Sequence, residues 1–280
     1  MSTYESRLRA LRQCMDARGY DALIIPRADE YLGEYLPAHN ERLACVSGFT
    51  GSAGVVILLR DNAAIFVDGR YTVQVQRQVC ADLFEYRHLA REPHIDWLTT
   101  ELEGGARVAC DPRLHSLRWY RSACEALDAA GLELVADTDN LVDACWSDRP
   151  EPRVEPALLL GTAYTGDSAS AKRTRIAAAI SEQGADAALV FAPDAISWLL
   201  NIRGTDIPCL PVVQGLALLE NSGDMTLFVD PRRIPDGFES HVGAGVRVLP
   251  ESSAAESLGS FGGRKVLADP ESANAWTQLM

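Results

Sequence analysis

The chain contains one sequence pattern twice, and this internal repeat limits the folds that it can adopt. Residues 4–18 carry apolar side chains at helical spacing, Gly19 ends the expected helix, and residues 22–25 are typical of a short buried strand. The same order returns in the second half, where Gly184 separates a helical pattern from an apolar strand. The two glycines lie 165 positions apart. Each copy is therefore expected to begin with a helix followed by a strand.

The second matching feature is a pair of strands joined by a turn. These strands are expected over residues 55–59, 64–68, 212–219 and 226–230. In both copies the second strand ends in an aspartate, which is followed by a turn residue and an arginine, at 68–70 and at 230–232. The spacing between Asp68 and Asp230 is 162 positions. The repeat therefore extends beyond the first helix and strand.

A third match, between residues 105–112 and 263–270, has a spacing of 158 positions. The spacing shrinks steadily along the chain, as it does when only loops shorten between two copies. Strands that alternate with helices predict an α/β fold, and here each copy is expected to form a mixed β-sheet flanked by helices.

The second copy is shorter than the first. After the third match the first copy continues with an expected helix over 116–130 and a strand over 132–135, whereas only residues 271–280 follow in the second. Either the second copy is a shorter variant, or the chain has been cut from a longer polypeptide. We favour the cut, because an α/β domain that lacks its last helix and strand exposes a sheet edge and an apolar face.

Proline and charged residues cluster over 147–155 and are typical of a semi-rigid linker. We therefore expect a first domain over 1–150, a linker over 151–165, and a second copy over 166–280 that is truncated at its C-terminus.

Composition excludes several classes of protein. The formal net charge of −13 opposes binding to nucleic acid, and its main effect is expected to be solubility. No apolar run approaches the roughly 20 residues of a membrane-spanning helix, and the polar start shows no secretory signal. The cysteines occur singly, without a Cys-x-x-Cys pair, which favours reduced thiols and a cytoplasmic location. They are Cys14, Cys45, Cys80, Cys110, Cys124, Cys145 and Cys209.

The residue pattern indicates no catalytic centre. The five histidines are far apart and lack metal-ligand spacing, so we interpret them as surface or cap residues; they are His39, His88, His94, His115 and His241. The glycine-rich segment 48–54 lacks both the helix that follows a serine nucleophile and the lysine of a phosphate loop, so it is expected to be a tight structural loop. Four tryptophans are expected to anchor the core: Trp119, Trp146, Trp198 and Trp276.

Arg70 is the one candidate site residue. An arginine at the end of a strand can bind a carboxylate through two parallel hydrogen bonds. Spacing alone favours a simpler role, an ion pair with Asp68 or a neighbouring acid.

Several segments resemble the front part of one family, the Xaa-Pro aminopeptidases (aminopeptidase P). The similar segments are 29–35, 47–54, 68–71, 140–143, 146–150, 164–166 and 196–208. The resemblance implies two creatinase/prolidase-like N-terminal domains ahead of a catalytic domain with the pita-bread fold. That domain would hold two divalent metals, expected to be manganese, through two aspartates, one histidine and two glutamates. None of these metal-binding motifs occurs in this sequence.

The family resemblance also implies a substrate and partners. The expected substrate is a peptide with proline in second position, from which the first residue is removed. The arginine that matches Arg70 is implicated in substrate contact in this family, which favours a functional role for it. The expected partners are the chain's own C-terminal catalytic domain and a second copy in a homodimer. The chain alone is expected to be inactive, without a metal site of its own.

Two alternatives remain open at this point. The chain could be a self-standing peptide-binding or dimerisation module that has no catalytic partner. A relative of creatinase or prolidase would act on creatine or on dipeptides, but those proteins carry one such front domain rather than two.

Overall fold

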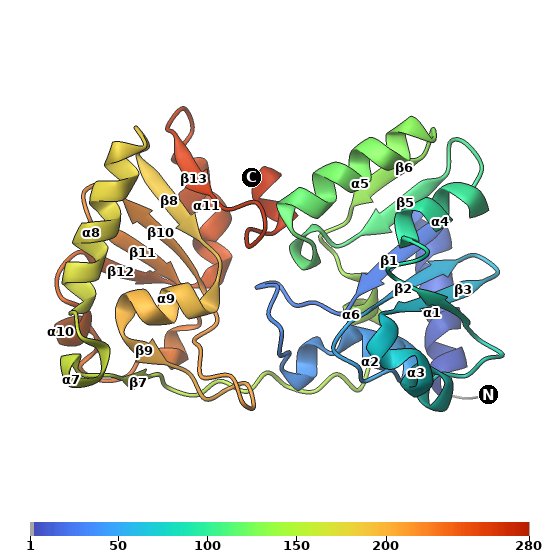
Figure 1. Cartoon of the computed structure of the whole chain (residues 1–280), viewed down its shortest axis with the longest axis horizontal. Helices are drawn as coiled ribbons and strands as arrows, with labels where there is room; N and C mark the ends of the chain where they lie inside the picture. The colour runs from blue at the N-terminus through green and yellow to red at the C-terminus, as the bar shows by residue number, and fades with distance from the viewer. Residues whose placement is uncertain (1–2, 280) are drawn as a thin grey trace. The chain divides into compact units, whose positions relative to one another are not determined.

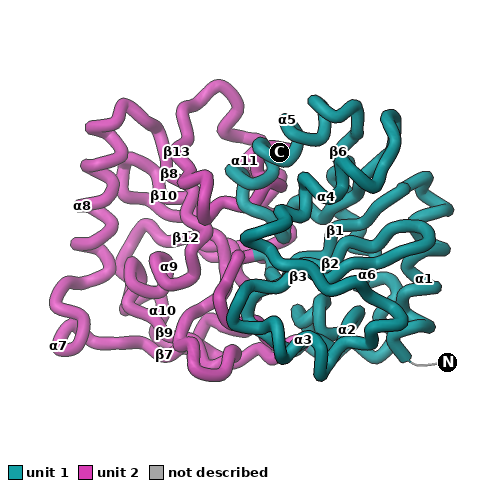
Figure 2. Tube along the Cα trace, turned by 45° about the vertical axis from the view of Figure 1, so that its right-hand side comes forward, with its two compact units in different colours: residues 1–30, 38–151 teal, residues 31–37, 152–280 magenta. Residues whose placement is uncertain are grey.

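The computed structural model describes residues 3–279, so residues 1, 2 and 280 of the two expected domains lie outside the described part. The chain divides into two compact units, residues 1–30 with 38–151 and residues 31–37 with 152–280 (Figure 2). Residues 152–165, for which the sequence predicts a linker, group with the second unit. Within it, the short strand β7 (Leu158–Leu159) pairs with β9 (Ile202–Arg203).

The first unit is built on a six-stranded mixed sheet in the order β4-β3-β2-β1-β5-β6 (Figure 1). Its strands are β1 (Ala22–Pro26), β2 (Gly54–Leu59), β3 (Ala63–Val67), β4 (Glu85–His88), β5 (Arg107–Cys110) and β6 (Glu133–Ala136). Strand β2 is antiparallel to its neighbours β1 and β3, and the pairings β1–β5, β5–β6 and β3–β4 are parallel. All five residues of β1 and of β3 are buried, because both faces of this sheet are covered.

Helices cover the two faces of the first sheet. They are α1 (Thr3–Arg18), α2 (Arg42–Ser47), α3 (Thr72–Gln78), α4 (His94–Glu101), α5 (Leu117–Ala129) and α6 (Leu141–Cys145), with 3₁₀ turns η1 (Ala38–Asn40), η2 (Gly69–Tyr71) and η3 (Pro112–Leu114). Helices α1, α2, α3 and α6 supply one core together with alternate residues of β1, β2 and β3. On the other face Trp97 of α4 packs edge-on against Phe66 of β3, at 5.5 Å between ring centroids.

The second unit has a five-stranded sheet in the order β12-β11-β10-β8-β13. Its strands are β8 (Ala187–Val190), β10 (Leu216–Glu220), β11 (Met225–Phe228), β12 (Val246–Leu249) and β13 (Val266–Ala268). Its helices are α7 (Thr162–Thr165), α8 (Ala169–Glu182), α9 (Pro193–Leu200), α10 (Phe238–Val242) and α11 (Ala254–Gly259), with 3₁₀ turns η4 (Pro231–Arg233), η5 (Glu251–Ser253) and η6 (Ala275–Gln278). Helices α8, α9 and α10 cover one face, and residues of α11 and η6 cover the other.

The predicted duplication is confirmed, since the five strands of the second sheet follow the order and direction of the first five. In both units the strand that follows the first long helix pairs antiparallel with the first strand of a hairpin. Its other edge pairs in parallel with a later strand. The helix expected over 116–130 and the strand expected over 132–135 correspond to α5 and β6. The second unit has no counterpart of β6 among the described residues.

One strand prediction needs correction. The strand expected over 212–219 begins only at Leu216. The preceding residues follow an irregular path, because the Val213 N–H donates to the Ser197 hydroxyl at 2.9 Å instead of to a neighbouring strand. Cys209, with φ at +64°, also departs from extended backbone.

Candidate functional site

Arg70 lies on the turn that leaves strand β3. Asp68 caps this turn, because its carboxylate accepts the Arg70 backbone N–H at 2.8 Å. The Arg70 guanidinium then reaches back to the same carboxylate, with Nη2 at 2.6 Å from Oδ2. These hydrogen bonds lower the pKa of Asp68. The local ion pair that spacing favours is therefore present, yet 65% of the Arg70 side chain is exposed.

An aromatic platform supports Arg70. Its guanidinium carbon lies 5.1 Å from the centroid of the Tyr71 ring, within the range of a cation–π contact. Phe49 packs edge-on against Tyr71 at 5.6 Å between centroids, and the Tyr71 and Ser52 hydroxyl oxygens are 2.8 Å apart. The hydrogen bond with Ser52 lowers the pKa of Tyr71. Three contacts thus hold the ring beneath the guanidinium.

The glycine-rich segment 48–54 forms the wall behind this platform. A Cβ atom on Gly51 would lie 2.3 Å from the Phe49 ring and 2.9 Å from Tyr71, so only glycine fits there. Gly48 has φ at +80°, in the left-handed region that favours glycine. The expected tight loop is confirmed. Its backbone lies close to the Phe49 and Tyr71 rings, which support Arg70.

The second unit repeats the turn but not the platform. Asp230 caps η4 and binds the Arg232 guanidinium at 2.6 Å, which lowers the pKa of Asp230 to about 2. The side chain of Arg232 is 69% exposed. The next residue, however, is Arg233 instead of a tyrosine, and it is buried against Asp206 at 2.6 Å. Arg70 and Arg232 therefore share a local ion pair and differ in their surroundings.

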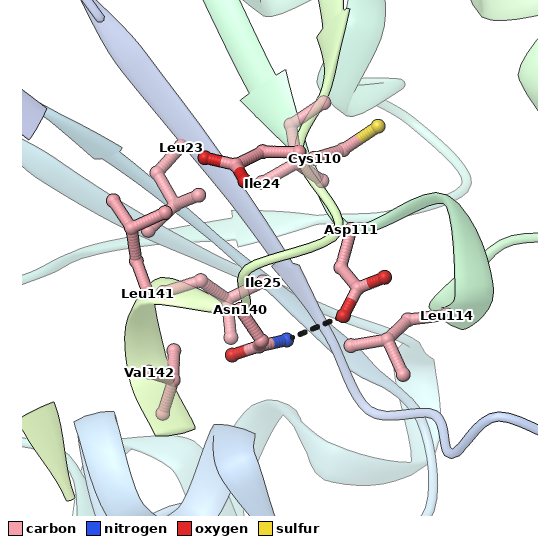
Figure 3. A pocket seen from close by; sticks show the side chains of 10 residues that line it. Leu23, Ile24, Ile25, Cys110, Asp111, Leu114, Asn140, Leu141 and Val142 are labelled. Carbon is pink, nitrogen blue, oxygen red and sulfur yellow. Dashed lines mark hydrogen bonds between the residues drawn. The ribbon is translucent and has the colours of Figure 1, made fainter. Parts of the chain in front are cut away.

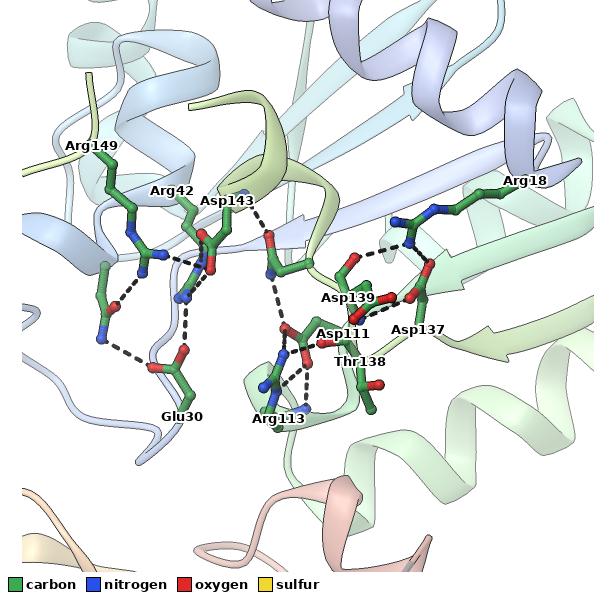
Figure 4. Close-up of polar contacts among 12 residues, drawn as sticks. Arg18, Glu30, Arg42, Asp111, Arg113, Asp137, Thr138, Asp139, Asp143 and Arg149 are labelled. Carbon is green, nitrogen blue, oxygen red and sulfur yellow. Dashed lines mark hydrogen bonds and ion pairs between the residues drawn. The ribbon is translucent and has the colours of Figure 1, made fainter. Parts of the chain in front are cut away.

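A buried polar network lies elsewhere in the first unit (Figure 4). Arg42, which is 1% exposed, donates to both carboxylate oxygens of Asp143 at 2.7 and 2.9 Å and to Glu30 at 2.7 Å. Arg149 also pairs with Asp143, at 2.9 Å. These charged groups pair with one another across positions that are distant in sequence, so we interpret the network as structural.

The cavity beside this network is too small for a ligand (Figure 3). It lies where β1 and β5 end and has a volume of about 10 Å³, the space of about one water molecule. The Asn140 side-chain amide donates to Asp111 at 3.0 Å within it. The end of the parallel strands, a common ligand position in α/β sheets, is thus filled by protein side chains.

The interpretation of the histidines as surface or cap residues is wrong for two of them. The His115 ring stacks on Trp119 at 3.8 Å between centroids, and His94 stacks on the same ring at 5.9 Å. Burial lowers the pKa of His94 to about 4 and that of His115 to about 3. This arrangement could not be predicted from the sequence, because it depends on α5 packing against α4.

The expectation of a core position is also wrong for Trp198, which is 42% exposed. Helix α9 turns its aliphatic residues inward and leaves Trp198 on the outer side. The Lys172 ammonium lies 4.4 Å from its ring centroid, and the Arg175 guanidinium carbon lies 5.9 Å from it. Trp198 therefore serves as a platform for cations.

A larger cavity, of about 420 Å³, lies in the second unit. Residues 31–35 form part of its wall, and Pro193, Leu210 and Val212 are among the residues that complete it. Residues 29–35 are one of the segments in which the sequence resembles the Xaa-Pro aminopeptidases. In this segment Leu32 has φ at +54°, a conformation that non-glycine residues adopt rarely.

The described residues do not provide a metal site. No group of three or more His, Cys, Asp or Glu side chains within 3–279 is arranged to hold a metal ion. The two divalent metals, which the family resemblance places in a catalytic domain, therefore have no set of ligands among the residues described. None of the helices in that range has the length and apolarity needed to cross a membrane.

Comparisons with known proteins cover nearly all of this chain. Family models described as "Creatinase/Prolidase N-terminal domain" match residues 7–145 and residues 148–280. Xaa-Pro aminopeptidase 2 of Homo sapiens is 35% identical over 81% of this chain, which corresponds to 34% of that protein. Xaa-Pro aminopeptidase 1 of Dictyostelium discoideum is 32% identical over 96% of this chain and 45% of its own length. The chain thus spans less than half of these relatives.

A solved structure agrees with these sequence matches. The X-prolyl aminopeptidase of Caenorhabditis elegans, described as a cytosolic enzyme with a di-nuclear active site, matches with a TM-score of 0.93 and 27% identity. The match covers 99% of this chain and 48% of that protein. Because the two family matches join within three residues and the structural match spans both, the chain belongs to the creatinase/prolidase N-terminal domain family and carries that domain twice, as in the N-terminal portion of Xaa-Pro aminopeptidases.

Proposed function

We propose that this chain is the non-catalytic N-terminal portion of a cytoplasmic, metal-dependent Xaa-Pro aminopeptidase. The observation that carries the proposal is the match to the Caenorhabditis elegans enzyme, which extends over 99% of this chain and 48% of that protein. The metals, which we propose to be two manganese ions, would then be held by a catalytic domain outside these 280 residues. The substrate would be a peptide with proline in second position, and the complete enzyme would be a homodimer to which these domains contribute contacts.

Within this function we assign substrate contact to Arg70. A guanidinium carries donors that can bind a peptide carbonyl or a terminal carboxylate. Arg70 meets two requirements for this role: its side chain is largely exposed, and Asp68 and Tyr71 restrict its orientation. An oriented cation loses less conformational entropy when a peptide binds than a freely moving one does.

The test is a chimeric enzyme in which this chain replaces the matched 48% of the Caenorhabditis elegans enzyme. The chimera should hydrolyse an Xaa-Pro peptide, whereas the 280-residue chain alone should neither hydrolyse it nor bind manganese. Hydrolysis by the isolated chain, or an inactive chimera that is folded and fully metallated, would reject the proposal.

The role of Arg70 is tested in the same chimera. Arg70→Ala should lower kcat/KM by about 10- to 100-fold, the loss of one or two charge-assisted hydrogen bonds, with metal content unchanged. Arg70→Lys should recover part of the activity, because lysine keeps the charge but lacks the planar fork. Arg232→Ala is the matched control and should leave kcat/KM unchanged. Equal effects of the two alanine substitutions would remove Arg70 from the site.

A second candidate function, a self-standing peptide-binding module, is favoured by the cavity of about 420 Å³ in the second unit. Its wall combines the apolar side chains of Leu32, Leu210 and Val212 with the carboxylates of Asp194 and Glu271. Such a cavity suits an apolar residue beside a free amino group. Calorimetric titration of the isolated chain with a short Xaa-Pro peptide separates the two functions. Saturable binding that Leu210→Asp abolishes and Arg70→Ala preserves would support the module.

A further inference from the structure

Two cysteines that are distant in sequence meet in the first unit. Cys14 lies in α1 and Cys145 is the last residue of α6, and their sulfur atoms are 3.4 Å apart. Both side chains are partly buried, at the margin of the core that α1 and α6 share. We propose that these thiols are an oxidation site, at which an intramolecular disulfide forms reversibly. This inference is independent of the proposed peptidase function.

Ion pairs on both sides keep the two thiols together. Arg7 of α1 binds Asp148 at 2.6 Å, three residues beyond Cys145. Near the other end of α1, Arg18 pairs with Asp137, which also accepts a hydrogen bond from the Tyr20 hydroxyl at 2.9 Å. Helix α1 and the segment 137–148 are thus fixed against each other at two points, and the thiols lie between these points in both segments.

The geometry requires only a small movement for bond formation. A disulfide has an S–S distance of about 2.05 Å, so the two sulfurs must approach by about 1.4 Å. Cys145 ends its helix, and Trp146 already has a non-helical backbone with ψ at 79°. The last turn of α6 can therefore adjust without breaking hydrogen bonds in the middle of a helix.

The reaction is a two-electron oxidation by a low-molecular-weight disulfide such as oxidised glutathione. One cysteine thiolate attacks the external disulfide, which releases one glutathione thiol, and the second cysteine displaces the other glutathione from the mixed disulfide. Both cysteine protons pass to the two released thiols, so atoms and electrons balance. Burial and the hydrogen bond with Cys14 raise the pKa of Cys145, so the rate should increase as pH rises above 7.

The expected stabilisation acts mainly on the first unit. The bond would close a loop from residue 14 to residue 145, which contains most of that unit together with residues 31–37 of the second. Closing so long a loop restricts the unfolded chain strongly. The second unit contains one cysteine, Cys209, and cannot form an internal disulfide.

The experiment treats the 280-residue chain with oxidised glutathione at pH 8, alkylates the remaining thiols, and maps disulfide-linked peptides by mass spectrometry. The expected internal link joins Cys14 to Cys145, is reversed by dithiothreitol, and raises the unfolding midpoint of the first unit by about 5–10 °C. The proposal is overturned if both thiols remain alkylatable after the exposed Cys80 and Cys209 have reacted. An internal link that involves Cys45, the buried thiol nearby, would also overturn it.

Single substitutions provide controls. Cys14→Ser and Cys145→Ser should each abolish the internal link and the shift in midpoint. Cys124→Ser, which removes a partly buried thiol on α5, should preserve both. If a serine variant fails to fold, the mapping of the unsubstituted chain still decides the question.

Discussion

The two units share the order of their strands and differ in the polar groups that they bury. The first unit encloses Arg42 among several carboxylates and stacks two histidines on Trp119. The second buries the pair of Arg233 with Asp206. It also buries Lys172 and Arg173, which donate to backbone carbonyl and side-chain amide oxygens instead of to carboxylates. Duplication has thus kept the apolar sheet and the capped turn after its third strand, while the buried charges have diverged. Apolar positions follow from strand pairing alone, whereas each buried charge needs a partner from elsewhere in the fold.

Substitution in the Arg233–Asp206 pair should lower the stability of the second unit by more than substitution of Arg42 lowers that of the first. Arg233→Ala leaves Asp206, whose side chain is 3% exposed, with one remaining hydrogen bond, from the Glu155 backbone N–H at 2.8 Å. We expect a loss of about 4 kcal/mol in the free energy of unfolding of the second unit. Hydrogen exchange measured by mass spectrometry reports on each unit separately and should show faster exchange in the second unit only.

Arg42→Ala is the matched substitution in the first unit and should cost less, about 2–3 kcal/mol. Its partners Glu30 and Asp143 are 30% and 23% exposed, and Asp143 retains Arg149. A larger loss for Arg42→Ala than for Arg233→Ala would mean that the number of hydrogen bonds, rather than the burial of the remaining carboxylate, determines the cost.

Acid should destabilise the first unit through its stacked histidines. Burial holds the pKa of His94 at about 4 and of His115 at about 3, below the ordinary value of about 6.5 in an unfolded chain. The unfolded chain therefore takes up protons first, and stability is complete above pH 6.5 and falls as pH decreases. At pH 5.5 the loss is about 1.4 kcal/mol for each histidine, or about 3 kcal/mol for the pair.

A phenylalanine substitution isolates this effect. His115→Phe keeps a ring stacked on Trp119 but cannot take up a proton, so it should remove about half of the pH dependence between pH 7 and pH 5.5. Chemical denaturation followed by hydrogen exchange in each unit gives the measurement. An unchanged pH dependence of the first unit in this variant would show that carboxylates, and not the histidines, control its response to acid.

These contrasts also show what sequence patterns could predict. The strands follow from local apolar runs, and the Asp68–Arg70 pair follows from a spacing of two residues across a turn, so both could be found in the sequence. The stacking of His94 and His115 and the meeting of Cys14 with Cys145 depend on helices that pack together after long separations. Alternating burial is a local property, whereas such contacts are properties of the whole fold.

The placement of residues 31–37 in the second unit could not be predicted for a related reason. The segment follows β1 directly, and its local pattern of tyrosine, glycine and acids is compatible with any loop. The structure shows which part of the chain this segment contacts, because the Tyr31 hydroxyl donates to Glu251 at 2.6 Å. For the candidate site, the sequence identified Arg70, but the platform of Phe49 and Tyr71 became visible only in the structure.

The smallest expected effect is the change in stability when the arginine of either repeated turn is replaced. This measurement distinguishes a role of Arg70 in substrate contact from a role in folding. Arg70 and Arg232 make the same ion pair, and both side chains are about two-thirds exposed. Exposed ion pairs contribute little to stability, so Arg70→Ala and Arg232→Ala should each leave the free energy of unfolding nearly unchanged. Denaturant titration of both variants checks this. Equal and small changes would mean that a selective loss of activity in Arg70→Ala arises from substrate contact. A loss of several kcal/mol in Arg70→Ala alone would instead assign the platform of Phe49 and Tyr71 a role in folding.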